Sequence, residues 1–202
     1  MLDTYKFIEK YKRISIIGME KNVGKTTLLN KLIADIGKTK KLGLTSIGRD
    51  GEDIDVVTNT DKPRIYVRKG SIIATGRNCL AKCDITKEIL YVTDFTTPMG
   101  SIVLVRALSD GYVDIAGPSY NKQVKIIVEL MEKFGSEISI VDGALGRKST
   151  AISDVSEATI LSTGAALSLD MLKVVEETQK TVYFLRFYLL FEKVPLWSTY
   201  LL

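Results

Sequence analysis

The residues best suited to chemistry lie between Gly18 and Thr27, in the sequence GMEKNVGKTT. Five residues separate Gly18 from Gly24, and Lys-Thr-Thr follows the second glycine. A β-branched run over residues 13–17 precedes this segment, and residues 25–36 carry apolar side chains at helical spacing, which predicts strand, glycine loop and helix. Such a loop offers backbone N–H groups and the positive end of a helix dipole to an anion. The pattern therefore predicts a phosphate-binding loop.

The loop pattern gives a role to each of its residues. Lys25 would place a point charge on the terminal phosphates of a nucleotide, and the Thr26 hydroxyl would be a ligand of Mg²⁺. The expected nucleotide contacts are Gly18, Asn22, Val23, Gly24, Lys25, Thr26 and Thr27. The alternative is structural: Gly24 permits a tight turn between strand and helix, and Lys25 is an exposed helical residue.

The interval between the glycines is one residue longer than in the usual phosphate-loop pattern. This spacing resembles the loop of dethiobiotin synthetases and of their relatives in the dimeric, ParA-like branch of P-loop proteins. That branch often carries a second, signature lysine five residues before the loop lysine. Here Glu20 holds that position. Lys21, one residue later, is then the candidate for contact with a phosphate, in its own subunit or across a homodimer.

Carboxylates that hold Mg²⁺ and orient an attacking group are expected after two further strands. Asp142 follows the run ISIV, as a metal-facing carboxylate at the end of a buried strand does; the alternative is an aspartate that caps the turn with Gly143. The segment GRDGED offers Asp50, Glu52 and Asp53, and a solvated loop has the same composition. The expected catalytic residues are Lys25, Lys21 and Asp142, and the expected metal ligands are Thr26, Asp50 and Asp142.

Composition excludes several kinds of chemistry. The 202 residues contain no histidine, so Ser-His-Asp hydrolysis, histidine-ligated zinc and histidine general-base catalysis are excluded. The net charge of +4 is spread along the chain, which argues against a nucleic-acid partner. Charged residues interrupt both terminal apolar segments, so we expect no membrane span or secretory segment, and a cytoplasmic protein.

The rest of the chain must build the sheet that positions these residues. Further strands are predicted at residues 42–48, 138–141 and 158–162, and further helices at 120–134 and about 165–180. Strands alternating with helices predict an α/β fold, a three-layer P-loop NTPase with a mostly parallel sheet covered on both faces. Period-two runs between about residues 63 and 117 predict a β-rich insertion.

These elements also predict a domain layout and a crevice. We expect the NTPase domain to cover residues 1–180, and residues 181–202 to be an apolar segment that suits a core helix or a subunit interface. Ligands in such sheets bind at the carboxyl ends of the strands. Residues expected at or just beyond strand ends, and therefore in one crevice, are Gly18, Asp50, Asp114 and Asp142.

Several segments together resemble the KamB-type subunit of lysine 5,6-aminomutase reactivases. These are SIIGMEKNVGKTTLLN, LTSIGRDGE, TDKPRIYVRKGSIIATG, VDGALGRKS and SEATILSTGAAL, which span most of residues 13–167. The resemblance implies a Mg-ATP-dependent, chaperone-like factor that acts with a second reactivase subunit on an adenosylcobalamin-dependent aminomutase. ATP is expected over GTP by default, because the nearest approach to a guanine-specific Asn-Lys-x-Asp is NKQV at Asn121.

Two other functions fit the same residues. The dethiobiotin-synthetase-like spacing suggests a small-molecule kinase or an ATP-dependent ligase. A nucleotide-sensing adaptor, which binds ATP and a partner without turnover, requires only the loop.

Overall fold

The computed structural model describes residues 8–48, 64–143 and 155–191, with side chains described as far as residue 186. Its elements in chain order are β1 (Arg13–Gly18), α2 (Lys25–Ile36), β2 (Leu42–Ser46), β3 (Ile65–Val67), β4 (Ile72–Gly76), the 3₁₀ helix η1 (Arg77–Lys82), β5 (Lys87–Thr97), β6 (Gly100–Ala107), β7 (Gly111–Val113), α3 (Asn121–Lys133), β8 (Ile138–Asp142), β9 (Ala158–Ser162) and α4 (Met171–Phe191).

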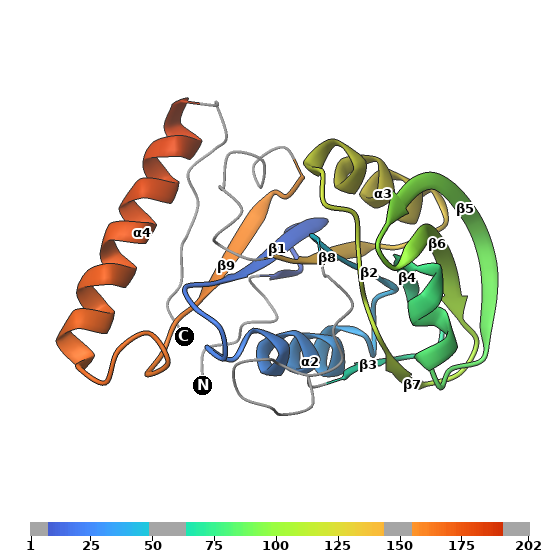
Figure 1. Cartoon of the computed structure of the whole chain (residues 1–202), viewed down its shortest axis with the longest axis horizontal. Helices are drawn as coiled ribbons and strands as arrows, with labels where there is room; N and C mark the ends of the chain where they lie inside the picture. The colour runs from blue at the N-terminus through green and yellow to red at the C-terminus, as the bar shows by residue number, and fades with distance from the viewer. Residues whose placement is uncertain (1–7, 49–63, 144–154, 192–202) are drawn as a thin grey trace.

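A seven-stranded sheet forms the centre, in the order β5-β6-β4-β2-β8-β1-β9 (Figure 1). The pairs from β4 through β9 are parallel, whereas β6 runs antiparallel to both β4 and β5. The buried strands β2 and β8 contain almost only residues with little exposed surface, as expected for parallel strands covered on both faces. The predicted α/β fold with a mostly parallel sheet is confirmed.

Helices α2 and α3 cover opposite faces of this sheet, and each face has its own apolar core (Figure 1). The buried side of α2 packs on the face that carries Ile14 and Ile16 of β1 and Ile73 of β4. The buried side of α3 packs on the face that carries Ile72 and Ala74 of β4. The alternation along β4 follows from the two-residue period of a strand. The result is three layers, helix on sheet on helix.

The strands of the predicted β-rich insertion belong to two different sheets. β4 lies beside β2 and continues the parallel part of the central sheet, and β5 and β6 extend it as a hairpin. The pairing of β5 with β6 is interrupted between Ile89 and Tyr91 and again between Val92 and Thr96. Among the described strands, β3 and β7 pair only with each other, in a two-stranded antiparallel sheet. The helix η1 was not predicted.

The last helix begins later than the predicted residue 165 and ends later than residue 180. The Asp170 carboxylate accepts the backbone N–H of Leu172 at 2.9 Å, and the Ser168 hydroxyl accepts the N–H of Asp170 at 3.1 Å. Asp170 therefore caps the helix, which fixes the start of α4. α4 passes through the boundary placed at residue 180. An interface role for residues 181–202 stays a prediction.

The carboxyl end of β2 is held by the segment that leads to α3. The Gly117 N–H is donated to the Ser46 hydroxyl at 2.9 Å, and the Gly48 N–H to the Pro118 carbonyl at 3.0 Å. A Cβ on Gly117 would lie 1.7 Å from the Ser46 carbonyl oxygen, so only glycine permits this approach. Residues 115–118 thus pack against the carboxyl end of β2.

Candidate functional site

At the centre of the sheet, the chain leaves two neighbouring strands, β1 and β8, in opposite directions. From β1 the chain passes through α2 to β2, on the far side of β8; from β8 it passes to β9, on the far side of β1. A crevice opens at the carboxyl ends of adjacent strands at such a point, and ligands of parallel sheets bind there. The site below lies at the ends of β1 and β8.

The loop between β1 and α2 has an unusual backbone. Asn22 has a φ of 60° and Gly24 a φ of 86°, both in the left-handed region. Asparagine tolerates that region better than most residues, and glycine enters it without cost. Left-handed residues set between others turn successive N–H groups toward one side and form a concave site for an anion. The loop is joined to β9 because the Met19 N–H is donated to the Ser162 carbonyl at 2.9 Å.

Gly18 is needed for a different reason, which is close packing. A Cβ there would lie 2.8 Å from Cδ of Lys25, 2.9 Å from Cγ of Lys25 and 2.8 Å from Cγ2 of Val23. The aliphatic part of Lys25 therefore lies directly over Gly18. Lys25 is half-buried and makes no hydrogen bond or ion pair with any residue that the structure describes. Its ammonium group stays available to an anion over the loop.

The first turn of α2 presents its N–H groups to the same place. Gly24 is the N-cap residue, so no side chain caps the helix, and the first turn contains no acidic residue. The first helical hydrogen bond runs from the Leu28 N–H to the Gly24 carbonyl at 2.9 Å. The N–H groups that precede it in an α-helix have no partner within the helix. Thr26, half-buried, lies in this turn, beside the positive end of the helix dipole.

Asp142 lies at the end of β8, directly beside the loop strand. It is opposite Ile16 of β1 on one side and opposite Ser46 of β2 on the other, and its side chain is half-buried. The Gly143 N–H is donated to the Ile16 carbonyl at 2.8 Å. The N–H of Gly143 therefore has a backbone acceptor. Asp142 and Gly18 thus end two neighbouring parallel strands at the same edge of the sheet.

The other predicted carboxylates and the second predicted cation differ in what the structure describes of them. Asp50, Glu52 and Asp53 lie outside the described residues. Lys21 is exposed on the loop, and its N–H is donated to the Glu20 carboxylate at 2.9 Å. The expectation for Asp114 was wrong: it follows β7, which is not part of the central sheet, and its carbonyl accepts the Thr75 hydroxyl of β4 at 3.0 Å. β4 is separated from β8 by β2.

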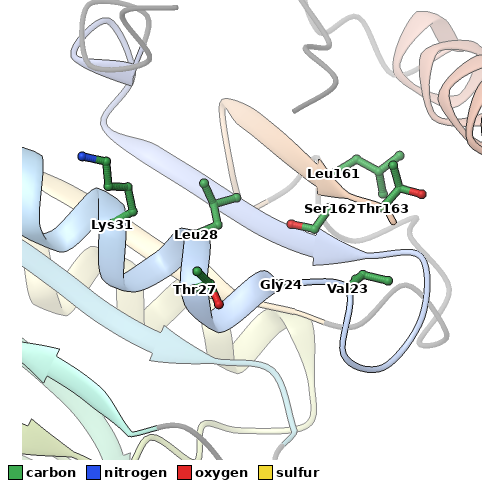
Figure 2. A pocket seen from close by; sticks show the side chains of 8 residues that line it. All are labelled: Val23, Gly24, Thr27, Leu28, Lys31, Leu161, Ser162 and Thr163. Atoms are coloured by element: carbon green, nitrogen blue, oxygen red, sulfur yellow. The ribbon is translucent and has the colours of Figure 1, made fainter. Parts of the chain in front are cut away.

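A cavity of about 340 Å³ adjoins the loop on the side of β9 (Figure 2). The lining residues come from the loop, the first two turns of α2 and the end of β9: Val23, Gly24, Thr27, Leu28, Lys31, Leu161, Ser162 and Thr163. The sequence had given no role to the end of β9. The available signal was the Ser-Thr-Gly that follows its apolar run, because polar and small residues at the end of a parallel strand face the ligand side.

The residues present suit Mg²⁺ bound with a polyphosphate. Mg²⁺ in such sites takes one or two protein oxygens and completes its shell with phosphate oxygens and water. Thr26 supplies a hydroxyl and Asp142 a carboxylate at the crevice. No cluster of three or more histidine, cysteine, aspartate or glutamate side chains occurs within residues 8–48, 64–143 and 155–191.

Among the described helices, none combines the length and apolar character that crossing a bilayer requires. Comparisons with protein-family models, with curated proteins and with solved structures give no match.

Proposed function

We propose that this chain is a Mg-ATP-binding P-loop ATPase. One observation carries the proposal: a loop with left-handed residues at Asn22 and Gly24 folds the Lys25 side chain over Gly18 and leads into an uncapped helix N-terminus. Backbone N–H groups, a helix dipole and an unpaired ammonium group all favour a polyanion at this point. No described acidic side chain in the first turn opposes it.

Each residue of the site has a role in this proposal. The loop N–H groups would hold the phosphates, and Lys25 would place its charge on the terminal phosphates, where negative charge develops during cleavage. The Thr26 hydroxyl and the Asp142 carboxylate would hold Mg²⁺, which would supply positive charge for phosphoryl transfer. Asp50 is the proposed second carboxylate, and Lys21 the proposed second cation.

The resemblance to KamB-type reactivase subunits supports a partner for this ATPase. We infer that it acts in the cytoplasm, together with a second reactivase subunit, on an adenosylcobalamin-dependent aminomutase. ATP hydrolysis would then drive release of a damaged cofactor. The chain need not contact cobalamin itself. The chain could form a homodimer, in which the exposed Lys21 side chain would contact the phosphates bound by the neighbouring subunit.

The nucleotide proposal is tested by calorimetric titration of ATP with Mg²⁺. We expect Lys25→Ala to weaken binding by about a hundredfold, because a charge-assisted contact with phosphate is lost. Lys125→Ala is the matched control, since Lys125 is exposed on α3 on the other face of the sheet. Equal ATP affinity in wild type and Lys25→Ala would refute the proposal.

The choice among functions is tested by phosphate release. An ATPase that serves a protein should be stimulated by inactivated aminomutase with the second subunit, and not by small metabolites. Stimulation by a metabolite alone would instead indicate a kinase or ligase. Nucleotide binding without phosphate release in any mixture would indicate an adaptor.

A further inference from the structure

Helix α4 lies beyond β9, at the margin of the molecule opposite β5 (Figure 1). One side of this helix is attached to the body of the protein. The hydroxyls of Thr163 and Thr178 lie 2.9 Å apart, and Thr178 is only 1% exposed. Thr178 also donates its proton to the Val174 carbonyl at 2.6 Å. Thr178 therefore marks the inner side of α4, and the opposite side of the helix faces outward.

The outer side of α4 is exposed along its length and apolar towards both ends. At 3.6 residues per turn, the residues on the side opposite Thr178 are Leu172, Lys173, Glu176, Lys180, Tyr183 and Phe184. All six are exposed, and the exposed fractions of the three apolar residues are 76% for Leu172, 68% for Tyr183 and 54% for Phe184. Large apolar side chains gathered on one exposed helix face indicate a contact surface, because their burial is favourable.

The order of these six residues along α4 suits contact with a second copy of the same helix. Two identical helices that pack antiparallel about Thr178 bring together residues that lie at equal distances on either side of it. The pairs formed between the two copies are Leu172 with Phe184, Lys173 with Tyr183, and Glu176 with Lys180. These are an apolar contact, a cation–π contact and an ion pair. The twofold symmetry forms each of them twice.

The charged residues at the middle of this surface distinguish between possible occupants. In a parallel pair of helices, Glu176 would meet Glu176 and Lys180 would meet Lys180, and such contacts between like charges are destabilising. A bilayer surface would bury both charged residues between the two apolar ends, which is unfavourable. Within one chain Lys180 lies 2.8 Å from Glu176. In the antiparallel pair, four charges of alternating sign would surround the twofold axis.

We propose that α4 is the contact surface of a homodimer, in which two copies of the helix pack antiparallel about Thr178. Of the described elements the contact requires only α4, and it does not involve Lys21. It is therefore independent of nucleotide binding and of the proposed function. The 21 residues of α4 extend for about 32 Å, so both apolar ends can be covered by one partner helix.

Sedimentation velocity of the purified chain tests the pairing of charges. We expect wild type to be a dimer at micromolar concentration. Glu176→Lys and Lys180→Glu should each weaken the dimer by about tenfold or more, because each creates two contacts between like charges. An equimolar mixture of the two variants should form a dimer again, since opposite charges then meet at both positions. Glu129→Lys, the same change of charge at an exposed position of α3, is the matched control and should remain a dimer.

Disulfide cross-linking tests the antiparallel arrangement. A mixture of Leu172→Cys and Phe184→Cys should give a covalent dimer on mild oxidation. Either variant alone should not, because the two copies of one position would be about 18 Å apart along the helix axis, too far for a disulfide. Wild type is the control for the native Cys79 and Cys83.

Four results would overturn the proposal. These are a monomeric wild type, a dimer that persists in both charge variants, a mixture of the charge variants that stays monomeric, and a covalent dimer formed by one of the new cysteine variants alone. Loss of ATP binding would not bear on it, because the interface does not include the phosphate site.

Discussion

Gly18 and Gly24 are required for different physical reasons, although they belong to one sequence pattern. At Gly24 a Cβ would meet nothing within 4 Å, and the constraint is the left-handed φ of 86°. At Gly18 the constraint is space, because Lys25 and Val23 lie where a Cβ would be. The two glycines therefore respond to different compensating changes.

A double-mutant cycle tests the contact between Gly18 and Lys25. We expect Gly18→Ala to lower the free energy of unfolding by about 1–3 kcal/mol, the usual cost of overpacking. In the Lys25→Ala background the cost should be smaller by about 1 kcal/mol, because Cγ and Cδ of Lys25 are absent. Urea unfolding of the four proteins measures both values. The same cost in both backgrounds would mean that Lys25 does not lie on Gly18.

Among individual residues, those of the β1–α2 loop were predicted better from the sequence than the residues around it. Gly18, Gly24 and Lys25 have a spacing that only a strand-to-helix loop explains, and Asp142 follows a strand whose type was recognisable. Ser162 was not predicted, because one hydroxyl after a strand has no periodicity to mark it. Asp114 was misplaced because a short period-two run does not reveal which sheet it joins.

For the helices and strands, the type of each element was easier to predict than its neighbours in the sheet. The boundaries of α2 and β9 were predicted from apolar spacing and confirmed. The position of β8 between β1 and β2 could not be read from the sequence, since β8 comes after the β-rich region and pairing depends on packing across the whole sheet. The start of α4 was predicted too early because the Ser168 and Asp170 cap was not recognised.

The cap of α4 gives a prediction at the level of the element. Asp170→Ala should cost about 1 kcal/mol of helix stability, because the Leu172 N–H loses its acceptor. Hydrogen exchange at the amide of Leu172 and its neighbours measures the change. Asp170→Asn should keep most of the protection, since an amide oxygen also accepts a hydrogen bond. Unchanged exchange in Asp170→Ala would show that the cap does not determine the start of α4.

At the scale of the whole molecule, the described residues form two apolar cores, one on each face of the central sheet, and β5 and β9 lie at the margins of that sheet. β9 at one margin supports the site, through the link between Met19 and Ser162. β5 at the other margin is eleven residues long and exposes Ile89 at 63% and Val92 at 55%. A long marginal strand with exposed apolar residues is the feature that most often promotes pairing between molecules.

The irregular pairing of β5 with β6 bears directly on solubility. An extra residue, Leu90, lies between Ile89 and Tyr91, and such bulges bend and twist a marginal strand so that another molecule adds to it poorly. Deleting Leu90 should remove the first of the two irregularities in β5 and increase concentration-dependent aggregation, measured by light scattering. Leu90→Ala, which keeps the extra residue, should remain dispersed; aggregation of both variants to the same extent would assign the effect to lost packing. We therefore expect this one extra residue, far from the site, to oppose pairing between molecules along β5.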